Sequence, residues 1–518
     1  MHSFRFRWRL AYAVALLLFG ALAPARAQGM QVQADHQDPA PARETAAAGL
    51  GMGGMTRDAS GTSWLPDASP MYALHRQRGP WTLMFHENAY LQFLHESGRR
   101  GDDQGGSINW AMGMAGRNVG RGHVGLRGMI SIEPWTIRGC GYPNLLASGE
   151  ECRGEVIHDR QHQHDLAMEL SAEYDGPLRG GTRWQLFGGP AAEPALGPVA
   201  YPHRISAMPN PIAPIAHHWF DSTHVSFGVI TAGVYSARWK IESSAFNGRE
   251  PDERRKNLDL GPLDSVAGRA WLLPTPRLAL QVSAGHLREA EAGEDGGPRR
   301  DVTKTTATAT YHWLGEHRVW ASTLGWGVNA EVDHATHALL AETSVTRDDR
   351  DSWYGRFEVV GKTAHDLDIA PEIPGCTNCV DAGTFTVSKL QGGYTHYLDS
   401  RAFKAGVGLV VSADFVPGRL RSAYGRTVNT GIGVFLTMRP AMMATLGEQA
   451  SAGAGRRAMV MVQTALDPGK LTCRAGFDPA TAPSTIYEGN TYYFCSAADR
   501  DTFLTDPKMS LSMMPPKQ

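Results

Sequence analysis

The chain has 518 residues, of which 42% are hydrophobic, and its formal net charge at pH 7 is −2. A charge this close to zero provides no strong field for nucleic acid, so we expect no nucleic-acid partner. Beyond the N-terminal residues no run of about 18 apolar residues occurs, which excludes transmembrane helices from the mature chain. The length exceeds that of one ordinary compact domain and suits one large domain with an appended module.

Residues 1–27 have the three parts of a secretory signal peptide. Arg5, Arg7 and Arg9 precede an apolar stretch over residues 10–22, and the Ala-Arg-Ala at residues 25–27 provides a small-residue cleavage site. A retained anchor helix is the alternative, but the apolar stretch is short and Pro24 follows it. Export would place the six cysteines in an oxidising compartment.

Residues 28–80 are rich in Gly, Ala, Asp and Pro, and we predict that they form a flexible leader. Met30, His36, Met52 and Met55 are scattered along this stretch. A metal-trapping tail is the alternative interpretation, although sparse Met and His residues in a leader usually have no such role.

Residues 81–439 show the alternation of a membrane β-barrel. In the stretch 238–246, Lys240, Glu242 and Ser244 share one face, whereas Trp239 and Ile241 fall on the other. The last predicted strand alternates in the same way, with residues 430, 432, 434, 436 and 438 toward lipid. One face suits water and the other suits lipid, as in outer-membrane barrels.

We predict sixteen strands, an even number, which the closure of an antiparallel bacterial barrel requires. Their connections alternate between long and short, and the short ones supply the Gly, Pro, Asp or Ser that tight turns favour. The predicted strands are 81–93, 107–116, 122–133, 166–174, 182–189, 224–235, 238–248, 264–273, 277–286, 303–314, 317–328, 338–347, 352–361, 385–397, 402–413 and 429–438.

The sorting of the connections predicts the orientation of the barrel. The N-terminus lies on the side of the short turns, so this side is expected in the periplasm and the long loops are expected outside. We therefore predict an all-β fold, a transmembrane antiparallel barrel in the bacterial outer membrane, surrounded by lipid. A soluble propeller or sandwich is the alternative, but it would not explain why long and short connections alternate.

The longest connection, residues 190–223, is the only strongly apolar one. It contains three prolines, two isoleucines and a Trp-Phe pair between residues 209 and 220. We expect it to fold into the lumen and narrow it, in the manner of the third loop of general porins. A cap packed over the outer rim is the alternative.

Two cysteine pairs lie in predicted loops. Cys140 and Cys152 bracket a short stretch of one long loop and are expected to form a disulfide. Cys376 and Cys379 form a C-x-x-C pair, which in a redox site would begin a helix. This pair lies between Pro-Gly and a polar, Gly-containing stretch, so a small structural disulfide is the favoured interpretation.

Histidines are dense at two places in the predicted loops. His158, His162 and His164 form one group, and His217 and His218 form the other, with His224 nearby. Imidazoles at spacings of two or four residues can share a metal ion, so these residues are weaker metal candidates. The alternative is that they are interface histidines without a ligand.

Charged residues on the predicted inward faces would set the ion preference of an open lumen. They are Glu169, Glu173, Arg183, Lys240, Glu242, Arg356 and Glu358. No metalloprotease, nucleophile-elbow or P-loop motif occurs, and no acid–base set is recognisable, so we predict that the protein is not an enzyme.

The C-terminal part begins with a small and polar linker over residues 440–457 and continues as a module over residues 458–518. In the module, Cys473-Arg-Ala-Gly-Phe-Asp-Pro, the run Tyr-Tyr-Phe-Cys-Ser that ends at Ser496, and Phe503 resemble the YHS domain. The resemblance implies a small α+β fold in the periplasm and a metal site with Cys473 and Cys495. Asp499 stands where the family often has a third cysteine, which makes the site less thiophilic. A Cys473–Cys495 disulfide and a module without metal are the alternatives.

The favoured function is therefore a porin-like outer-membrane barrel with a YHS-like module that handles a soft metal, Cu or Zn, with copper first. The alternative is a non-conducting scaffold that binds metal or a protein partner. An outer-membrane hydrolase is a third class, which would require a clustered acid–base set. The solute, the metal and the oligomeric state stay open at this point.

Overall fold

The computed structural model describes residues 57–291, 298–332, 334–369, 384–398, 402–442, 484–487, 490–494, 500 and 503. The chain divides into two compact units, Met1–Ala441 and Met442–Gln518, and each is described by itself. The predicted signal peptide and residues 28–56 of the predicted leader lie outside the described residues.

The first unit is a closed antiparallel barrel of sixteen strands, joined to a further short strand, β1 (Leu74–Arg78). Each predicted strand matches one strand of the barrel, and closure into one sheet excludes the propeller and the sandwich. The barrel strands are β2 (Trp81–Glu96), β3 (Asp103–Val119), β4 (Gly122–Ile130), β7 (Ala167–Pro177), β8 (Arg183–Ala191), β9 (Val229–Tyr235), β10 (Trp239–Phe246), β11 (Ser265–Thr275), β12 (Leu278–Glu291), β13 (Arg300–Leu314), β14 (Arg318–Ala330), β15 (Ala335–Arg347), β16 (Asp351–Lys362), β17 (Phe385–Tyr397), β18 (Phe403–Phe415) and β19 (Val428–Pro440).

The barrel closes between its first and last strands. In this seam Leu436 of β19 pairs with Leu91 of β2, and Val434 pairs with Phe93. β1 pairs with the first residues of β2, from Trp81 to Phe85, before β19 takes over. Every barrel strand therefore has a partner on both sides, which removes the exposed sheet edge that favours aggregation.

The outer surface of the wall is apolar because the side chains alternate. On β10, Ile241 is 58% exposed, whereas Lys240 and Glu242 on either side of it are buried. On β19, Val434 and Leu436 are exposed and Phe435 between them points inward. No helix in the described parts of the chain is long and apolar enough to cross a membrane.

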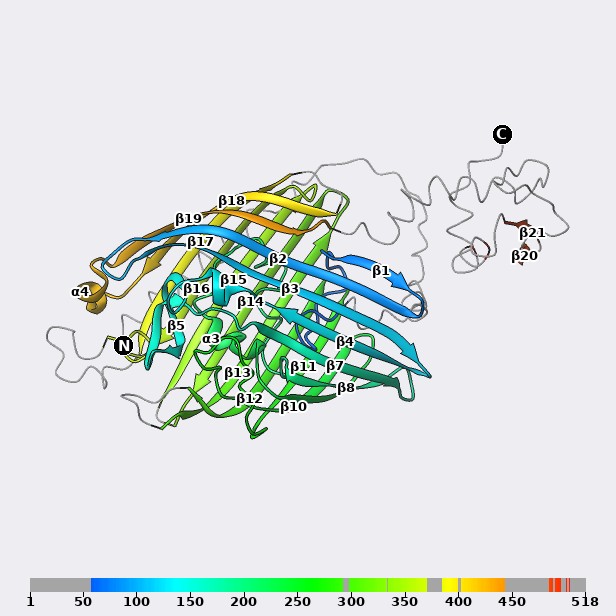
Figure 1. The fold of residues 1–518 in the computed structure, drawn as a ribbon, viewed down its shortest axis with the longest axis horizontal. Helices are drawn as coiled ribbons and strands as arrows, with labels where there is room; N and C mark the ends of the chain where they lie inside the picture. The colour runs from blue at the N-terminus through cyan, green and yellow to red at the C-terminus, as the bar shows by residue number, and fades with distance from the viewer. Residues whose placement is uncertain are drawn as a thin grey trace, which may run out of the picture. The chain divides into compact units, whose positions relative to one another are not determined.

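The connections at one rim of the barrel are tight turns, and those at the other rim are mostly long. The long connections carry α2 (Glu133–Thr136), β5 (Tyr142–Cys152), β6 (Glu155–Gln161), α3 (His217–Phe220), η1 (Ser222–His224), η4 (Gly418–Leu420) and α4 (Arg421–Tyr424). In Figure 1, α3 and β5 lie within the outline of the barrel wall. Contacts of α3 and β5 with wall residues show that the two connections that carry these elements turn inward.

Among the described residues, three segments occupy the lumen: residues 57–73, 131–166 and 192–228. We call them together the plug. The first contradicts the prediction of a flexible leader as far as residue 80. Arg269 of β11 donates hydrogen bonds to Thr62 (3.0 Å) and Ser63 (2.9 Å), and Lys240 lies 4.7 Å from the centre of the Trp64 ring. The polar composition of this segment therefore suits a polar barrel interior rather than bulk water.

The third plug segment, residues 192–228, crosses the lumen as the sequence predicts. Arg204 donates to Glu342 of β15 at 2.5 Å, and the Trp219 indole donates to Thr336 at 2.9 Å. The backbone N–H of Ala216 donates to Glu358 of β16 at 3.0 Å. Polar groups of the plug thus find partners on the wall, as buried polar groups require.

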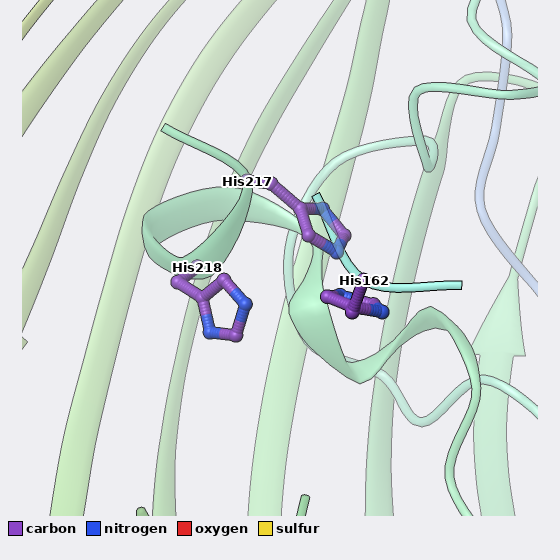
Figure 2. Close-up of side chains that lie close together, drawn as sticks. All are labelled: His162, His217 and His218. Atoms are coloured by element: carbon purple, nitrogen blue, oxygen red, sulfur yellow. The ribbon is translucent and has the colours of Figure 1, made fainter. Parts of the chain in front are cut away.

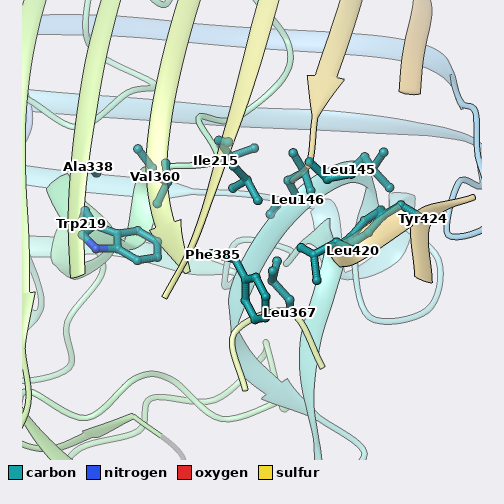
Figure 3. Packing of buried hydrophobic residues seen from close by; sticks show 14 of the residues in the cluster. Leu145, Leu146, Ile215, Trp219, Ala338, Val360, Leu367, Phe385, Leu420 and Tyr424 are labelled. Carbon is teal, nitrogen blue, oxygen red and sulfur yellow. The ribbon is translucent and has the colours of Figure 1, made fainter. Parts of the chain in front are cut away.

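A hydrophobic core joins the plug to the wall on the side of β15–β17. Leu145 and Leu146 of β5 and Ile215 and Trp219 of the third plug segment pack together with residues of the wall and of the β18–β19 connection (Figure 3). The other members labelled in the figure are Ala338, Val360, Leu367, Phe385, Leu420 and Tyr424. Burial of this core fixes β5 and α3 relative to the barrel.

Candidate metal centre

Three histidines from two plug segments meet inside the barrel. His217 and His218 begin α3, and His162 follows β6 on a separate connection (Figure 2). Consecutive helical residues point about 100° apart, so the two rings of α3 approach His162 from different directions. The His162 ring centre lies 5.6 Å from that of His217 and 5.8 Å from that of His218.

The geometry of the three rings suits a shared metal ion. One ring nitrogen from each histidine lies within 4.8 Å of those from the other two, and all three residues are buried. Three imidazoles with one open position form the usual ligand set of a zinc site that also binds water or another ligand.

The partners of the three rings orient them in a consistent way. His217 Nδ1 lies 2.8 Å from Asp221 Oδ1, His218 Nδ1 lies 2.9 Å from Glu250 Oε1, and His162 Nδ1 lies 3.1 Å from the Gln163 carbonyl oxygen. The Nε2 atoms of all three rings are buried and have no hydrogen-bond partner among the described residues. Metal-binding histidines show this arrangement, with one nitrogen held by an oxygen and the other left for the metal.

Burial influences the protonation of the ring nitrogens. It lowers the pKa of His162 well below its ordinary value, and the neighbouring Arg255 adds to this effect. Burial also lowers the pKa of His217, although Asp221 partly opposes the change. Both rings are therefore neutral near pH 7, which is the form that binds a metal ion.

The disulfide predicted between Cys140 and Cys152 is confirmed, and it closes the segment that packs against His218. Gly149 lies within this segment with φ of 121°, and a Cβ atom at this position would lie 2.2 Å from Cε1 of His218. Glu150, the next residue, lies 3.3 Å from His162 Nδ1. A glycine is therefore required where the backbone faces the imidazole.

Several carboxylates lie beside His218, on the side of the long connections. His218 also forms a potential ligand group with Glu250 and Glu291. A cavity of about 30 Å³ beside His218 is lined by Glu150, Glu250, Glu291, Glu331 and Asp366, together with nine other residues. Burial favours the protonated form of Glu250, but the adjacent His218, together with Lys304 and Arg299, outweighs this effect and lowers the pKa of Glu250 to about 2. A cavity lined by this many carboxylates attracts cations.

The two other predicted histidines have different surroundings. His164 lies 2.8 Å from Glu133 Oε1 through one ring nitrogen and 3.2 Å from the Tyr201 hydroxyl through the other. His158 is only partly buried and forms ion pairs with Asp159 and Asp368. Both ring nitrogens of each residue therefore have partners, so these two residues complete no ligand set.

The predicted lumen-facing charges lie on the inward side of the wall, where they contact the plug or other residues of the wall. Arg356 donates to Glu342 at 3.1 Å, Glu242 accepts from Arg269 at 2.9 Å, and Glu358 accepts from the plug. The others have these partners: Lys240 with Thr62, Glu173 with Arg127, Glu169 with Ser171, and Arg183 with Asp175.

Sequence reasoning missed three residues that surround the three histidines. Asp221 lies four residues after His217, a spacing at which helical side chains meet, and this signal was available. Gly149 and Glu250 lie far from α3 in the sequence and gave no signal. Cys376, Cys379, Cys473, Cys495 and Asp499 lie outside the described residues.

No family model matches the chain, and no characterised protein matches it by sequence. Solved structures with a similar barrel include OmpF of Salmonella typhi in complex with daunomycin, with 10% identity, 70% of this chain and 100% of that chain covered, and a TM-score of 0.42. An anion-selective porin from Comamonas acidovorans has 10% identity over 70% of this chain and 98% of that one, with a TM-score of 0.42. OprB of Pseudomonas putida has 9% identity over 69% of this chain and 94% of that one, with a TM-score of 0.43. Similarities of this size identify neither a family nor a function.

Proposed function

We propose that this protein is an outer-membrane β-barrel whose plug binds a divalent transition metal through His162, His217 and His218. The observation that carries the proposal is that one ring nitrogen from each of these buried histidines lies within 4.8 Å of those from the other two, while Nε2 of every ring lacks a hydrogen-bond partner among the described residues. A buried polar atom without a partner costs about 1–3 kcal/mol, so three on neighbouring rings require an explanation. A metal ion bound through these rings would provide one.

The membrane location is inferred from the wall. Its outward positions are apolar, its inward positions are polar, and its long connections emerge at one rim, as in bacterial outer-membrane proteins. In this orientation the long connections face the outside of the cell, and the acidic cavity beside His218 lies toward their rim. A cation arriving from outside would then meet carboxylates before the histidines.

The ligand type narrows the identity of the metal. Imidazole nitrogens suit Zn²⁺, Cu²⁺ and Ni²⁺, whereas Mg²⁺ and Ca²⁺ prefer oxygen ligands. We propose a binding role and not a catalytic one, since the three histidines lie among plug residues that hold the barrel interior together.

The test is a calorimetric titration of the purified full-length protein with Zn²⁺, in a background with Cys473 and Cys495 replaced by serine. Loss of an outer-sphere partner weakens metal binding 10–100-fold, so His217→Gln should weaken it by more than about 100-fold. His312→Gln is the matched control, because His312 is fully buried in the barrel and contacts Ser69 instead of the three histidines. Equal affinities in all three proteins would refute the proposal.

The contacts of the plug support the non-conducting alternative over an open pore. The charged residues expected to set ion preference are engaged with the plug or with other residues of the wall, so we expect small or no conductance in planar bilayers. Conductance comparable to that of an open sixteen-stranded porin would show that the plug leaves a water-filled path.

A second metal site in the C-terminal module is proposed from the resemblance to the YHS domain. Among the described residues of this module, β20 (Ser484–Tyr487) pairs with β21 (Asn490–Tyr493), and the rings of Phe494 and Phe503 pack 5.2 Å apart. Cys495 directly follows Phe494 in the sequence, so the proposed ligand comes next to the hairpin and the aromatic pair along the chain.

In the reduced full-length protein, Cys495→Ser should abolish Cu(I) binding at this site, and Asp499→Cys should strengthen it. Unchanged Cu(I) affinity in Cys495→Ser would favour the disulfide.

A further inference from the structure

A second cavity inside the barrel has a different ligand chemistry from the three histidines. It has a volume of about 70 Å³ and lies where residues 57–73, β2, β3 and the third plug segment meet. Water occupies about 30 Å³ in the liquid, so the cavity can hold an ion or a small ligand. Thioethers and imidazoles line it: Met71, Met84, Met208, His86 and His203.

The two imidazoles lie together against an indole. The ring centres of His86 and His203 are 5.5 Å apart, and each lies near Trp110, at 5.1 Å and 4.4 Å respectively. Nε2 of His86 is buried and has no hydrogen-bond partner among the described residues. The cavity therefore contains a ring nitrogen that no described residue satisfies.

Methionine is concentrated on this part of the inner wall. Met84 of β2 pairs in register with Met114 of β3, and Met112 of β3 pairs with Met129 of β4. These four side chains and Met168 are buried in one cluster, which Met71 also contacts. Inward positions of outer-membrane barrels are usually polar, so a row of thioethers here is unusual. Packing accounts for Met112, Met114 and Met129, which do not line the cavity, but it does not explain why Met71, Met84 and Met208 line it together with two histidines.

We propose that this cavity is a binding site for a soft monovalent cation, Cu(I) or Ag(I), with ligands from Met71, Met84, Met208, His86 and His203. Thioether sulfur is a soft and neutral ligand that selects Cu(I) over the harder divalent ions. The Trp110 ring adds a π surface, which stabilises a cation in a desolvated place. Asp58 and Glu87 also line the cavity and bring carboxyl oxygens to it. This site goes beyond the proposed function and does not depend on it.

The experiment is an anaerobic titration of the full-length protein with Cu(I), buffered by a competing chromophoric chelator. Cys376, Cys379, Cys473 and Cys495 are replaced by serine so that thiolates do not contribute. The test variant is Met84→Leu with Met208→Leu, and the matched control is Met112→Leu with Met129→Leu, which belongs to the same cluster but not to the cavity. Leucine conserves the volume of methionine, so both double variants should fold and show the same heat-modifiable migration on gels.

We expect the test variant to bind Cu(I) at least tenfold more weakly than the parent, while the control variant keeps the parental affinity. X-ray absorption at the copper edge should show sulfur and nitrogen neighbours in the parent, and fewer sulfur neighbours in the test variant. Zn²⁺ affinity at the three histidines should stay the same in both variants, which separates this site from the one proposed above. Equal Cu(I) affinity in all three proteins, equal losses in both variants, or a copper spectrum without sulfur neighbours would overturn the proposal.

Discussion

The wall and the plug of this barrel are held by different kinds of interaction. Each wall strand is joined to two neighbours by backbone hydrogen bonds, so the stability of the wall is distributed around the ring. The plug is joined to the wall by side chains: by buried hydrogen bonds and ion pairs, among them Arg204 with Glu342 and Lys389 with Asn144, and by the hydrophobic core. The wall therefore depends on backbone pairing, whereas the plug depends on side-chain contacts that substitutions can remove.

Removal of one buried charge between the plug and the wall should have the largest effect, because it should disturb the plug and leave the wall intact. Glu342 lies between Arg204 of the plug and Arg356 of β16, and Arg204 also contacts Asp221, the partner of His217. Glu342→Gln would remove the counter-charge that the two buried guanidinium groups share and leave Arg204 with Asp221 alone; breaking a buried ion pair in this way costs about 3–5 kcal/mol. We expect protease-sensitive residues in 192–228 and increased bilayer conductance, with the wall still heat-modifiable on gels.

The control for this variant is Glu358→Gln. Glu358 accepts a hydrogen bond from the backbone of Ala216, and a glutamine oxygen can accept the same bond. Protease resistance should therefore change less in this control. If Glu342→Gln stays as protease-resistant and as poorly conducting as the parent, the plug does not depend on the ion-pair network.

The same contrast explains what the sequence could predict. The strands of the wall could be predicted from local patterns, because the alternation of polar and apolar side chains and the residues of tight turns are visible within short windows of sequence. The plug contacts are non-local: Arg204 and Glu342 are 138 residues apart. The density of histidines was visible, but which three meet depends on how two connections fold into the lumen. The sequence predicts a flexible leader at residues 57–73 because the wall residues that contact their polar side chains lie far away along the chain.

The disulfide tests how far the second plug segment, residues 131–166, supports the three histidines. Cys140 and Cys152 close a short loop, which should contribute about 2–3 kcal/mol to the stability of that segment. Since this loop carries Gly149 and Glu150 beside the histidines, replacing both cysteines with serine should loosen it and weaken Zn²⁺ binding. The wall should be unaffected, as judged by heat modifiability.

Labelling of intact cells provides a second measurement on the same pair. A membrane-impermeant maleimide should react with neither Cys140 nor Cys152 until a reductant is added, in a variant that retains only these two cysteines. Immediate labelling without reductant would show free thiols. Unchanged Zn²⁺ affinity in the double serine variant would show that the loop keeps its conformation without the bond.

The smallest expected effect concerns a single carboxylate outside the plug segments. Glu250 belongs to the β10–β11 connection, and its Oε1 lies 2.9 Å from Nδ1 of His218. Loss of such a partner weakens metal binding about 10–100-fold without removing a ligand, because the ring loses its orientation and basicity. Glu250→Gln should therefore weaken Zn²⁺ binding less than His217→Gln does, and it should leave the protease resistance of the plug unchanged.

Glu155→Gln, at an exposed position of β6, is the control, and its Zn²⁺ affinity should match that of the parent. If Glu250→Gln weakens Zn²⁺ binding and His217→Gln does not, Glu250 acts as a ligand and His218 with Glu250 and Glu291 forms the metal site instead.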